Sequence, residues 1–596
     1  MTGPHLATRA GAAISRRRNA PSGEPGGPPT AGQSWGTRAA RLLGRHWLLV
    51  VLLAAGLALR IAAQIAYQPA LLYVDTLKYL YGASPGADPL GYTLVLRSIL
   101  VFGNLGLVAL AQHVLGLAMA VALYAVLLRR GTIRWLAAVA VAPVLLDAYQ
   151  VQIEQTIMPD VWFEALMVAG LGVLLWRPEV TVRLAAVAGV ILGLSATVHQ
   201  VGEVLIVPAV FYLVVAAGSV RRAVTTAVAL AVAFVLPIVL YCGVAYLHTG
   251  HFRLARGQTT VGRVVGAADC AALTLPPAVR PLCPTPAEQA KGPDWLEHSK
   301  YSPLAPGSIP AGENGGRLTS ELTSAIKSQQ PLRILGGIVR DSVRLFAVTR
   351  TPNPWVTPLS RWQFQTTYPT YPHWITLGPG NTIVVGIQRV AFGQFHFSTL
   401  KPAYGGPAKV NRPVASFLRS YQLGGGFSPG PFLLLCTVAG VLGTLLAVVL
   451  QVSRARGGAR DPRAARARRL ALACLLFTAT AVVLLLAQDV VEFSWRYQLP
   501  AVITLPPAGI LGVSALLALR RNGAQPAARR GGAEPPAGGS APRPDGAGLP
   551  GPGLADPGLA DPGLAGGTAA SPVNGSAPQA GERPDQAGGE PGPAGA

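Results

Sequence analysis

Asp75 lies in the stretch of the chain best suited to chemistry, YVDTLKYLYGASPGADPLGY at Tyr73–Tyr92. The stretch follows directly on an apolar run, yet it holds Asp75, Lys78, four tyrosines and a second aspartate. A carboxylate held near a bilayer surface can act as a general base that takes a proton from a hydroxyl. The alternative interpretation is a solvated loop aspartate. Tyr79 and Tyr81 suit the aromatic belt of a membrane interface.

A second group of polar side chains follows the third apolar run, in DAYQVQIEQTIMPD. Asp147, Gln150 and Glu154 share one helical face by their i, i+3, i+7 spacing. Asp160 and Glu164 stand one turn apart at the start of the next run, where a helix N-terminus also favours acids without any function.

Three further polar sites lie at or inside apolar runs. His199 and Glu203 in HQVGE have i, i+4 spacing, but two ligands are too few for a metal site. Glu492 and Arg496 precede the last run, and Arg60 lies within the first, where it must pair or snorkel. Taken together, the carboxylates and cations predict a polar cavity at one membrane face, and therefore a functional site.

The elements that position these residues are predicted to be membrane-spanning helices. The 596-residue chain has a mean hydropathy of +0.40 and 13% charged residues, which indicates an integral membrane protein. Windows of about 19 residues give ten candidate spans, several shorter than the ideal of about 20. They are Trp47–Tyr67, Leu107–Leu128, Trp135–Tyr149, Val161–Trp176, Leu184–Val198, Val204–Ala217, Ala223–Leu247, Pro431–Val452, Leu470–Gln488 and Leu499–Leu519. The first lacks a small-residue cleavage site, so we expect a retained span rather than a signal peptide.

Arginine clusters predict the orientation of these spans. If the spans alternate, every short cluster between them falls on one side, which places both termini in the cytoplasm and makes the cell membrane the expected location. The loop from His248 to Gly430 is then external, and within it Pro331–Val348 has the spacing of an interfacial helix. The net charge of +23 is largely explained by these clusters, so we expect no nucleic-acid partner.

The remaining segments give a domain organisation. Residues 1–40 and 522–596 are rich in Gly and Pro, and we expect both to be disordered cytoplasmic ends around a membrane domain at 45–520. Cys242, Cys436 and Cys474 lie in apolar runs as packing residues. Cys270 and Cys283 share the external loop, where an oxidising exterior favours a disulfide over two free thiols. No Cys/His pattern indicates a metal, and we expect no cofactor.

The order of these features resembles the GT-C glycosyltransferases, which are polytopic enzymes that use polyprenyl-phosphate-linked sugars. The segments most similar to their protein-mannosyltransferase-like and aminoarabinose-transferase-like branches are DTLKYL…DPLGYTLVLR (Asp75–Arg97), EQTIMPDVWFEAL (Glu154–Leu166) and RYQLP (Arg496–Pro500). The resemblance covers roughly residues 45–520. The chain departs from it in having a lone Asp75 where many relatives have paired acids, fewer spans, and a long external loop of unfamiliar kind.

The resemblance implies an inverting transfer of a sugar to an acceptor hydroxyl on a glycan, lipid or protein at the external face. Asp75 matches the first-loop acid of the family and would be the general base. Arg496 is the first candidate for binding the donor phosphate, followed by Lys78 and Arg60. The candidates for binding sugar or acceptor are Glu154, Asp160, His199, Glu492 and Tyr79.

Two other classes of protein remain open at this stage. A secondary transporter also carries charges inside the membrane and broken helices, although no inverted repeat is evident and the external loop is long for one. A non-catalytic scaffold for envelope polymers is the third class, because a likeness of fold alone does not establish chemistry.

Overall fold

A computed structural model describes residues 41–520, apart from 42, 74, 82–88, 256–259, 369–381, 386–387, 392–401 and 456–460. The terminal segments that we expect to be disordered, 1–40 and 522–596, lie outside the described residues. So does the second aspartate of the first loop, Asp88.

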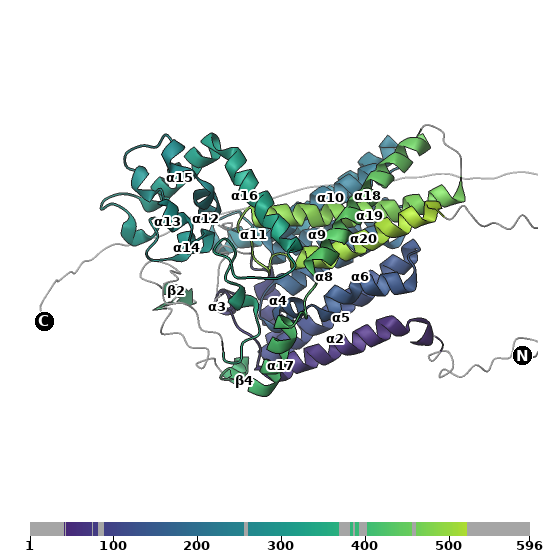
Figure 1. Ribbon diagram of the computed structural model, residues 1–596, viewed down its shortest axis with the longest axis horizontal. Helices are drawn as coiled ribbons and strands as arrows, with labels where there is room; N and C mark the ends of the chain where they lie inside the picture. Colours follow the sequence, from purple (N-terminus) through teal and green to yellow (C-terminus); the bar gives the residue numbers. More distant parts are fainter. Residues whose placement is uncertain are drawn as a thin grey trace, which may run out of the picture. The chain divides into compact units, whose positions relative to one another are not determined.

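Long helices make up most of the described chain (Figure 1). Each of the ten predicted spans coincides with a helix. They are α2 (Trp47–Ala66), α5 (Leu105–Arg130), α6 (Arg134–Leu146), α8 (Asp160–Trp176), α9 (Val182–Val198), α10 (Ile206–Ala216), α11 (Val220–Thr249), α18 (Gly430–Ala455), α19 (Pro462–Asp489) and α20 (Leu499–Arg520). The chain is thus an all-α polytopic membrane protein.

The number of spans is the part of this prediction that stays unconfirmed. By length and composition, six described helices can cross a membrane, namely α2, α5, α11, α18, α19 and α20. A seventh span results if α6 and α7 (Ala148–Gln155), which meet at a bend of 48°, count as one. The predicted Trp135–Tyr149 span therefore ends early, because Asp147 has extended backbone and its side chain caps α7 by accepting from the Tyr149 N–H.

Helices α18, α19 and α20 lie side by side in the bundle. Most residues of α20 are buried, as expected for a helix that is apolar on all sides. Gly512 permits the close approach of α20 to α18, because a Cβ at this position would stand 2.1 Å from the carbonyl oxygen of Ala439.

The short loops between these helices meet at one end of the bundle, which we call the arginine end. Arg130, at the end of α5, donates to the carbonyl of Leu175 in the last turn of α8 and to that of Arg177 directly after it. Arg222, at the start of α11, pairs with Glu179 at 2.7 Å. This gathering is what alternating spans require, and the first loop lies at the other end, which we call the first-loop end.

Small helices fill the sequence between α11 and α18. They are α12 (Val261–Ala267), α13 (Pro286–Gln289), α14 (Pro293–His298), α15 (Gly315–Gln329), α16 (Pro331–Val343) and α17 (Arg412–Leu423), with 3₁₀ turns that include η2 (Cys270–Ala272), η3 (Arg280–Leu282), η5 (Arg344–Phe346) and η6 (Leu359–Trp362). Helices α12 and α15 share an apolar core of their own, so this part of the predicted external loop is a folded cap.

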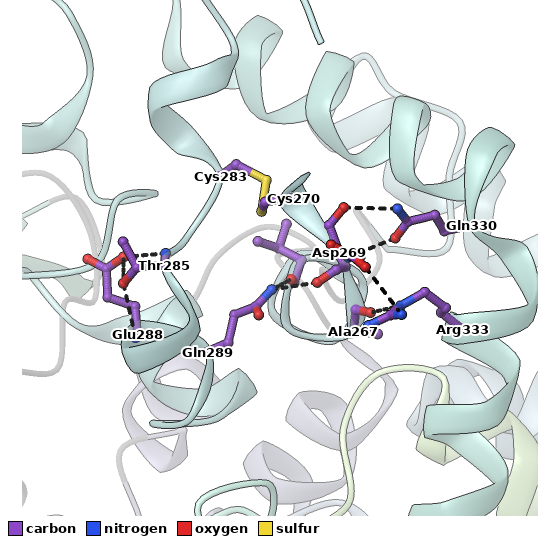
Figure 2. The surroundings of a disulfide bond; sticks show 11 residues. Ala267, Asp269, Cys270, Cys283, Thr285, Glu288, Gln289, Gln330 and Arg333 are labelled. Carbon is purple, nitrogen blue, oxygen red and sulfur yellow. Dashed lines mark hydrogen bonds and ion pairs between the residues drawn. A yellow bond between two sulfur atoms is a disulfide. The ribbon is translucent and has the colours of Figure 1, made fainter. Parts of the chain in front are cut away.

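A disulfide between Cys270 and Cys283 joins η2 to the residue after η3 (Figure 2). Its Cα atoms lie 5.9 Å apart, within the usual range for a bridged pair. Asp269, next to Cys270, donates its N–H to the side chain of Gln330 at 2.8 Å and accepts from the same amide at 3.0 Å. The disulfide therefore lies next to the pair of hydrogen bonds between Asp269 and Gln330, which also stabilises the cap.

Helix α16 connects the cap to the bundle. Ser342 donates a hydrogen bond to Asp489 at the end of α19, and Asp341 forms a buried ion pair with Arg263 of α12. Its other face carries an exposed apolar stripe, composed of Leu332, Leu335, Val339 and Val343. An interfacial helix, as predicted for this segment, requires such a stripe.

Short strand pairs complete the described structure. Strand β1 (Tyr67–Gln68), directly after α2, pairs antiparallel with β4 (Lys409–Val410). Strands β2 (Thr382–Val385) and β3 (Gln388–Ala391) form a second antiparallel pair.

Candidate active site

Arg496 contacts two segments that are distant in the sequence, at the first-loop end of the bundle. Its Nε donates to Oδ1 of Asp160, the first residue of α8, at 2.8 Å. Its Nη1 stands 3.7 Å from Oδ2 of Asp75 in the first loop. The side chains of Arg496 and Asp160 are buried, whereas that of Asp75 is 31% exposed. We call these three residues the Asp75 triad.

The groups around Arg496 stabilise its protonated, positively charged form. Burial opposes the charge, but Asp160, Tyr497 and Asp75 outweigh burial and raise the pKa of the guanidinium well above its usual value. One oxygen of Asp160, Oδ2, is buried and has no hydrogen-bond partner among the described residues. The triad is therefore a fixed cation with an incompletely satisfied carboxylate on one side and a partly exposed carboxylate on the other.

The first loop is held in place by the segment before α8. Leu71 forms a parallel bridge with Thr156, donating to Gln155 O at 2.9 Å and accepting from Ile157 N at 3.0 Å. Thr76, at the start of α3 (Thr76–Tyr81), donates its hydroxyl to Ile157 O at 3.1 Å. These backbone contacts bring Asp75 to Asp160 across 85 residues of sequence.

Lys78 and Tyr79 have different surroundings within α3. The Lys78 Nζ lies 3.2 Å from Oδ1 of Asp75, so this cation pairs with a member of the triad. Tyr79 is 3% exposed and packs edge-on against Tyr92 at 5.1 Å. A ring buried in this way offers no free face to a sugar, so Tyr79 belongs to the packing of the loop.

Aromatic rings surround Arg496. The guanidinium carbon lies 5.4 Å from the ring centre of Trp362 and 5.2 Å from that of Tyr497, within range of a cation–π contact. Trp362 comes from η6 of the cap and also packs on Tyr73 at 4.9 Å. Sequence reasoning missed Trp362, because nothing in the cap's sequence indicates which of its aromatic residues returns to the bundle.

Arg60 and Glu154 lie in a different cluster, deep within the bundle. Arg60 donates to Glu154 Oε1 at 2.7 Å and to the carbonyls of Val144 and Leu145 at 3.0 and 2.9 Å. Glu154 Oε2 stands 3.0 Å from His113 Nδ1. Arg60 and Glu154 are 2% and 0% exposed. Each is the buried ion-pair partner of the other, where the sequence had suggested a donor phosphate for Arg60 and a sugar or acceptor for Glu154.

This buried cluster reaches toward the triad along α8. Gln150 donates to Glu154 Oε1 at 3.4 Å and to Glu164 Oε2 at 2.9 Å. Glu164 is one helical turn from Asp160. We call Arg60, His113, Gln150, Glu154 and Glu164 the Arg60 network. His113 is its unforeseen member, since a lone histidine in an apolar run gives no signal of its partner.

A group of titratable side chains flanks the triad on the cap side. Arg361, next to Trp362, binds both oxygens of Asp294 at 2.9 and 3.0 Å. Burial, followed by repulsion from Asp294 and Glu297, raises the pKa of Glu492 to about 7, although His298 and Thr357 act in the opposite direction. Glu492 therefore lies in the chain four residues before Arg496, with a carboxyl whose raised pKa of about 7 is near neutrality.

His199 lines a cavity of about 230 Å³ that also touches Tyr497. The cavity is bordered by Gln200, Glu203 and Gln488 as well. Since Tyr497 follows Arg496 in the chain and contacts its guanidinium, this cavity adjoins the triad. Among the described residues, no group of three or more His, Cys, Asp or Glu side chains is arranged to hold a metal ion.

Comparison with known proteins yields matches only to solved structures; no family model and no curated protein sequence matches the chain. The Pmt1-Pmt2 protein O-mannosyltransferase complex of S. cerevisiae, bound to its sugar donor, matches with 15% identity and a TM-score of 0.28 over 38% of each chain. ArnT from Cupriavidus metallidurans, whose structures include one bound to undecaprenyl phosphate, matches in the apo state with 14% identity and a TM-score of 0.29 over 74% of this chain and 77% of its own.

A third match is the oligosaccharyltransferase of Archaeoglobus fulgidus, with 13% identity and a TM-score of 0.33 over 81% of this chain and 51% of its own. The chain thus spans about two fifths of the mannosyltransferase and half of the oligosaccharyltransferase. All three are GT-C glycosyltransferases, which is the class that the sequence motifs resemble.

Proposed function

We propose that the chain is a membrane glycosyltransferase that moves a sugar from a polyprenyl-phosphate donor to an acceptor hydroxyl at the first-loop end of the bundle. The observation that supports this best is the Asp75 triad, in which a partly exposed carboxylate stands beside a buried, fixed cation. We assign the activity to residues 45–520. With both termini in the cytoplasm, as the arginine clusters predict, the reaction takes place on the external face.

In this proposal Asp75 is the general base. The acceptor oxygen forms a bond to the anomeric carbon while its proton passes to the Asp75 carboxylate. The bond from the anomeric carbon to the phosphate oxygen breaks, and its electron pair stays on the lipid phosphate. Attack from the face opposite the leaving group inverts the anomeric centre. Asp75 is the triad member suited to this role because its side chain is the most exposed of the three.

Arg496 would stabilise the phosphate as its charge grows. A guanidinium offers a planar fork of donors that matches phosphate oxygens. Asp160 engages only its Nε, and the contact with Asp75 at 3.7 Å exceeds hydrogen-bond length. Two terminal nitrogens thus remain for a phosphate, while Asp160 fixes the plane of the fork and Lys78 adds a second charge beside Asp75.

The decisive experiment measures consumption of radiolabelled polyprenyl-phosphate sugars by the purified full-length protein. Loss of label from the lipid fraction reports transfer whatever the acceptor is. We expect Asp75→Asn to lower turnover by about 10²–10⁴, because a placed base typically supplies that factor, with donor binding nearly unchanged.

Asp461→Asn is the matched control. Asp461 caps α19 at the arginine end by accepting from the Arg463 N–H, and Asn is an equally good N-cap. This variant should transfer sugar at the wild-type rate. Near-normal transfer by Asp75→Asn would remove the base assignment. Movement of an intact solute in sealed vesicles, without consumption of any lipid-linked donor, would favour a transporter instead.

A further inference from the structure

A second charged site lies at the arginine end of the bundle, away from the Asp75 triad. It is a cavity of about 70 Å³ between the ends of α5, α10, α11, α18 and α19 and the loop after α8. Five arginines border it, and a single carboxylate, Glu179, accompanies them. We call Arg130, Arg222, Arg454, Arg468 and Arg469 the arginine cluster.

Two of the five arginines have partners that account for their positions. Arg130 is buried and donates to Leu175 O at 2.7 Å and Arg177 O at 2.9 Å, at the C-terminal end of α8. Arg222 pairs with Glu179 at 2.7 Å and donates to Val180 O at 3.1 Å. Such contacts are the ordinary use of arginines near helix ends.

The other three arginines lack a carboxylate partner among the described residues. Arg468 donates to Gln451 Oε1, a neutral acceptor, at 2.9 Å. For Arg454 and Arg469 no ion pair is formed within the part of the chain that the structure describes. Glu179, which also attracts Arg454 and Arg468, is already bound to Arg222, so among the described residues that border the cavity the positive side chains outnumber the carboxylates by five to one.

The size of the cavity limits the anion that fits. A volume of about 70 Å³ has room for several water molecules, since one water needs roughly 10–15 Å³ of such space. A small tetrahedral oxyanion suits this space. Arginine forks bind phosphate oxygens in pairs, and basic pockets between helices at a membrane surface bind lipid head groups.

We propose that the arginine cluster binds one phosphate group, carried either by an anionic lipid head group or by a free phosphate ion. The apolar part of the wall, formed by Leu213, Ala216 and Leu472, lies beside the charged part. A phosphate here would relieve the mutual repulsion of the arginines and tie α18 and α19 to α10 and α11. This proposal is independent of the proposed sugar transfer.

The test uses the purified full-length protein, stripped of lipid in an uncharged detergent. One arm titrates a short-chain phosphatidic acid and the other inorganic phosphate, with bound ligand counted by native mass spectrometry and the thermal midpoint followed in parallel. We expect one saturable phosphate per chain. Arg468→Gln/Arg469→Gln should weaken its binding by about tenfold or more, since hydrogen bonds between a guanidinium and a phosphate are among the stronger ones.

Arg221→Gln is the matched control. Arg221 neighbours Arg222 but does not border the cavity. Arg221→Gln removes one positive charge from the arginine end, as each substitution of the double variant does, and should leave phosphate binding unchanged. Saturable binding of the lipid alone identifies a head-group site, and saturable binding of both ligands identifies a general phosphate site. Binding of neither, or equal weakening in Arg221→Gln and the double variant, overturns the proposal.

Discussion

The Asp75 triad and the Arg60 network use the same chemistry, an arginine between carboxylates, in two different surroundings. In the network, Arg60 and Glu154 are both buried, and the hydrogen bonds of the pair end on protein groups: carbonyls, Gln150 and His113. In the triad, Arg496 is also buried, but one of its partners, Asp75, is 31% exposed. Exposure of one carboxylate separates a site that can meet a substrate from one that holds helices together.

The network has a clear structural purpose. Arg60 of α2 binds the carbonyls of Val144 and Leu145, where α6 ends and the chain bends into α7. Buried carbonyls at a helix end need donors, above all where water is absent. Gly116 on α5 leaves room for the arrangement, since a Cβ there would stand 2.1 Å from Glu154 Oε1.

Breaking the network should have the largest effect on the protein. Arg60→Met should destabilise the fold by about 3–5 kcal/mol, because it leaves the buried charge of Glu154 without its cation. The measurement is the unfolding midpoint of the protein in detergent.

The double variant Arg60→Met/Glu154→Gln is the control for this prediction. It removes both charges while Gln can still accept from His113, so it should be less destabilised than Arg60→Met alone. A single variant within about 0.5 kcal/mol of the wild type would show that the pair contributes little to stability.

The corresponding change in the triad should act mainly on catalysis. Arg496→Ala removes a partner of the donor phosphate in both ground and transition states, so kcat should fall by about 10²–10³ and the donor KM should rise. Arg496→Lys keeps the charge without the planar fork and should recover part of the loss. The measurement is the initial rate over a range of donor concentrations.

Stability distinguishes this result from simple unfolding. Arg496→Ala also leaves Asp160 without its cation, so the double variant Arg496→Ala/Asp160→Asn should regain stability without regaining transfer. If sugar transfer returned together with stability, Arg496 would be a structural residue like Arg60, and the difference between the two clusters would disappear.

The sequence predicted the membrane-spanning architecture because hydropathy and arginine clusters are local signals. It also singled out Asp75, Lys78, Asp160 and Arg496 as candidates, since a charge at the edge of an apolar run is costly and needs a reason, and the structure brings these four side chains together. Spacing along the chain could not tell Arg60 from Arg496, because the partner that decides each role lies 94 and 336 residues away.

The cap was the least predictable part of the molecule. Its disulfide was expected from two cysteines in one external segment, and the structure contains it. The return of η6 to the site, with Trp362 against Arg496 and Arg361 against Asp294, depends on tertiary contacts of the cap that leave no periodic pattern in the sequence.

The smallest expected effect concerns Glu492, the titratable group where the cap meets the site. Burial, with repulsion from Asp294 and Glu297, raises its pKa to about 7 in the folded protein, from an ordinary value of 4.5. Between these values the folded state binds more protons than the unfolded state, so stability from this group is fully present below about pH 4.5 and is lost as the pH rises through about 7.

Glu492→Gln removes the titration, so the variant should lose part of the wild type's decline in thermal midpoint between pH 4.5 and 7. Asp461→Asn, a change in an exposed acid at the arginine end, should keep the wild-type slope. Parallel slopes in wild type and Glu492→Gln would mean that Glu492 is ionised across this range, and that solvent reaches the cap side of the triad as freely as it reaches Asp75.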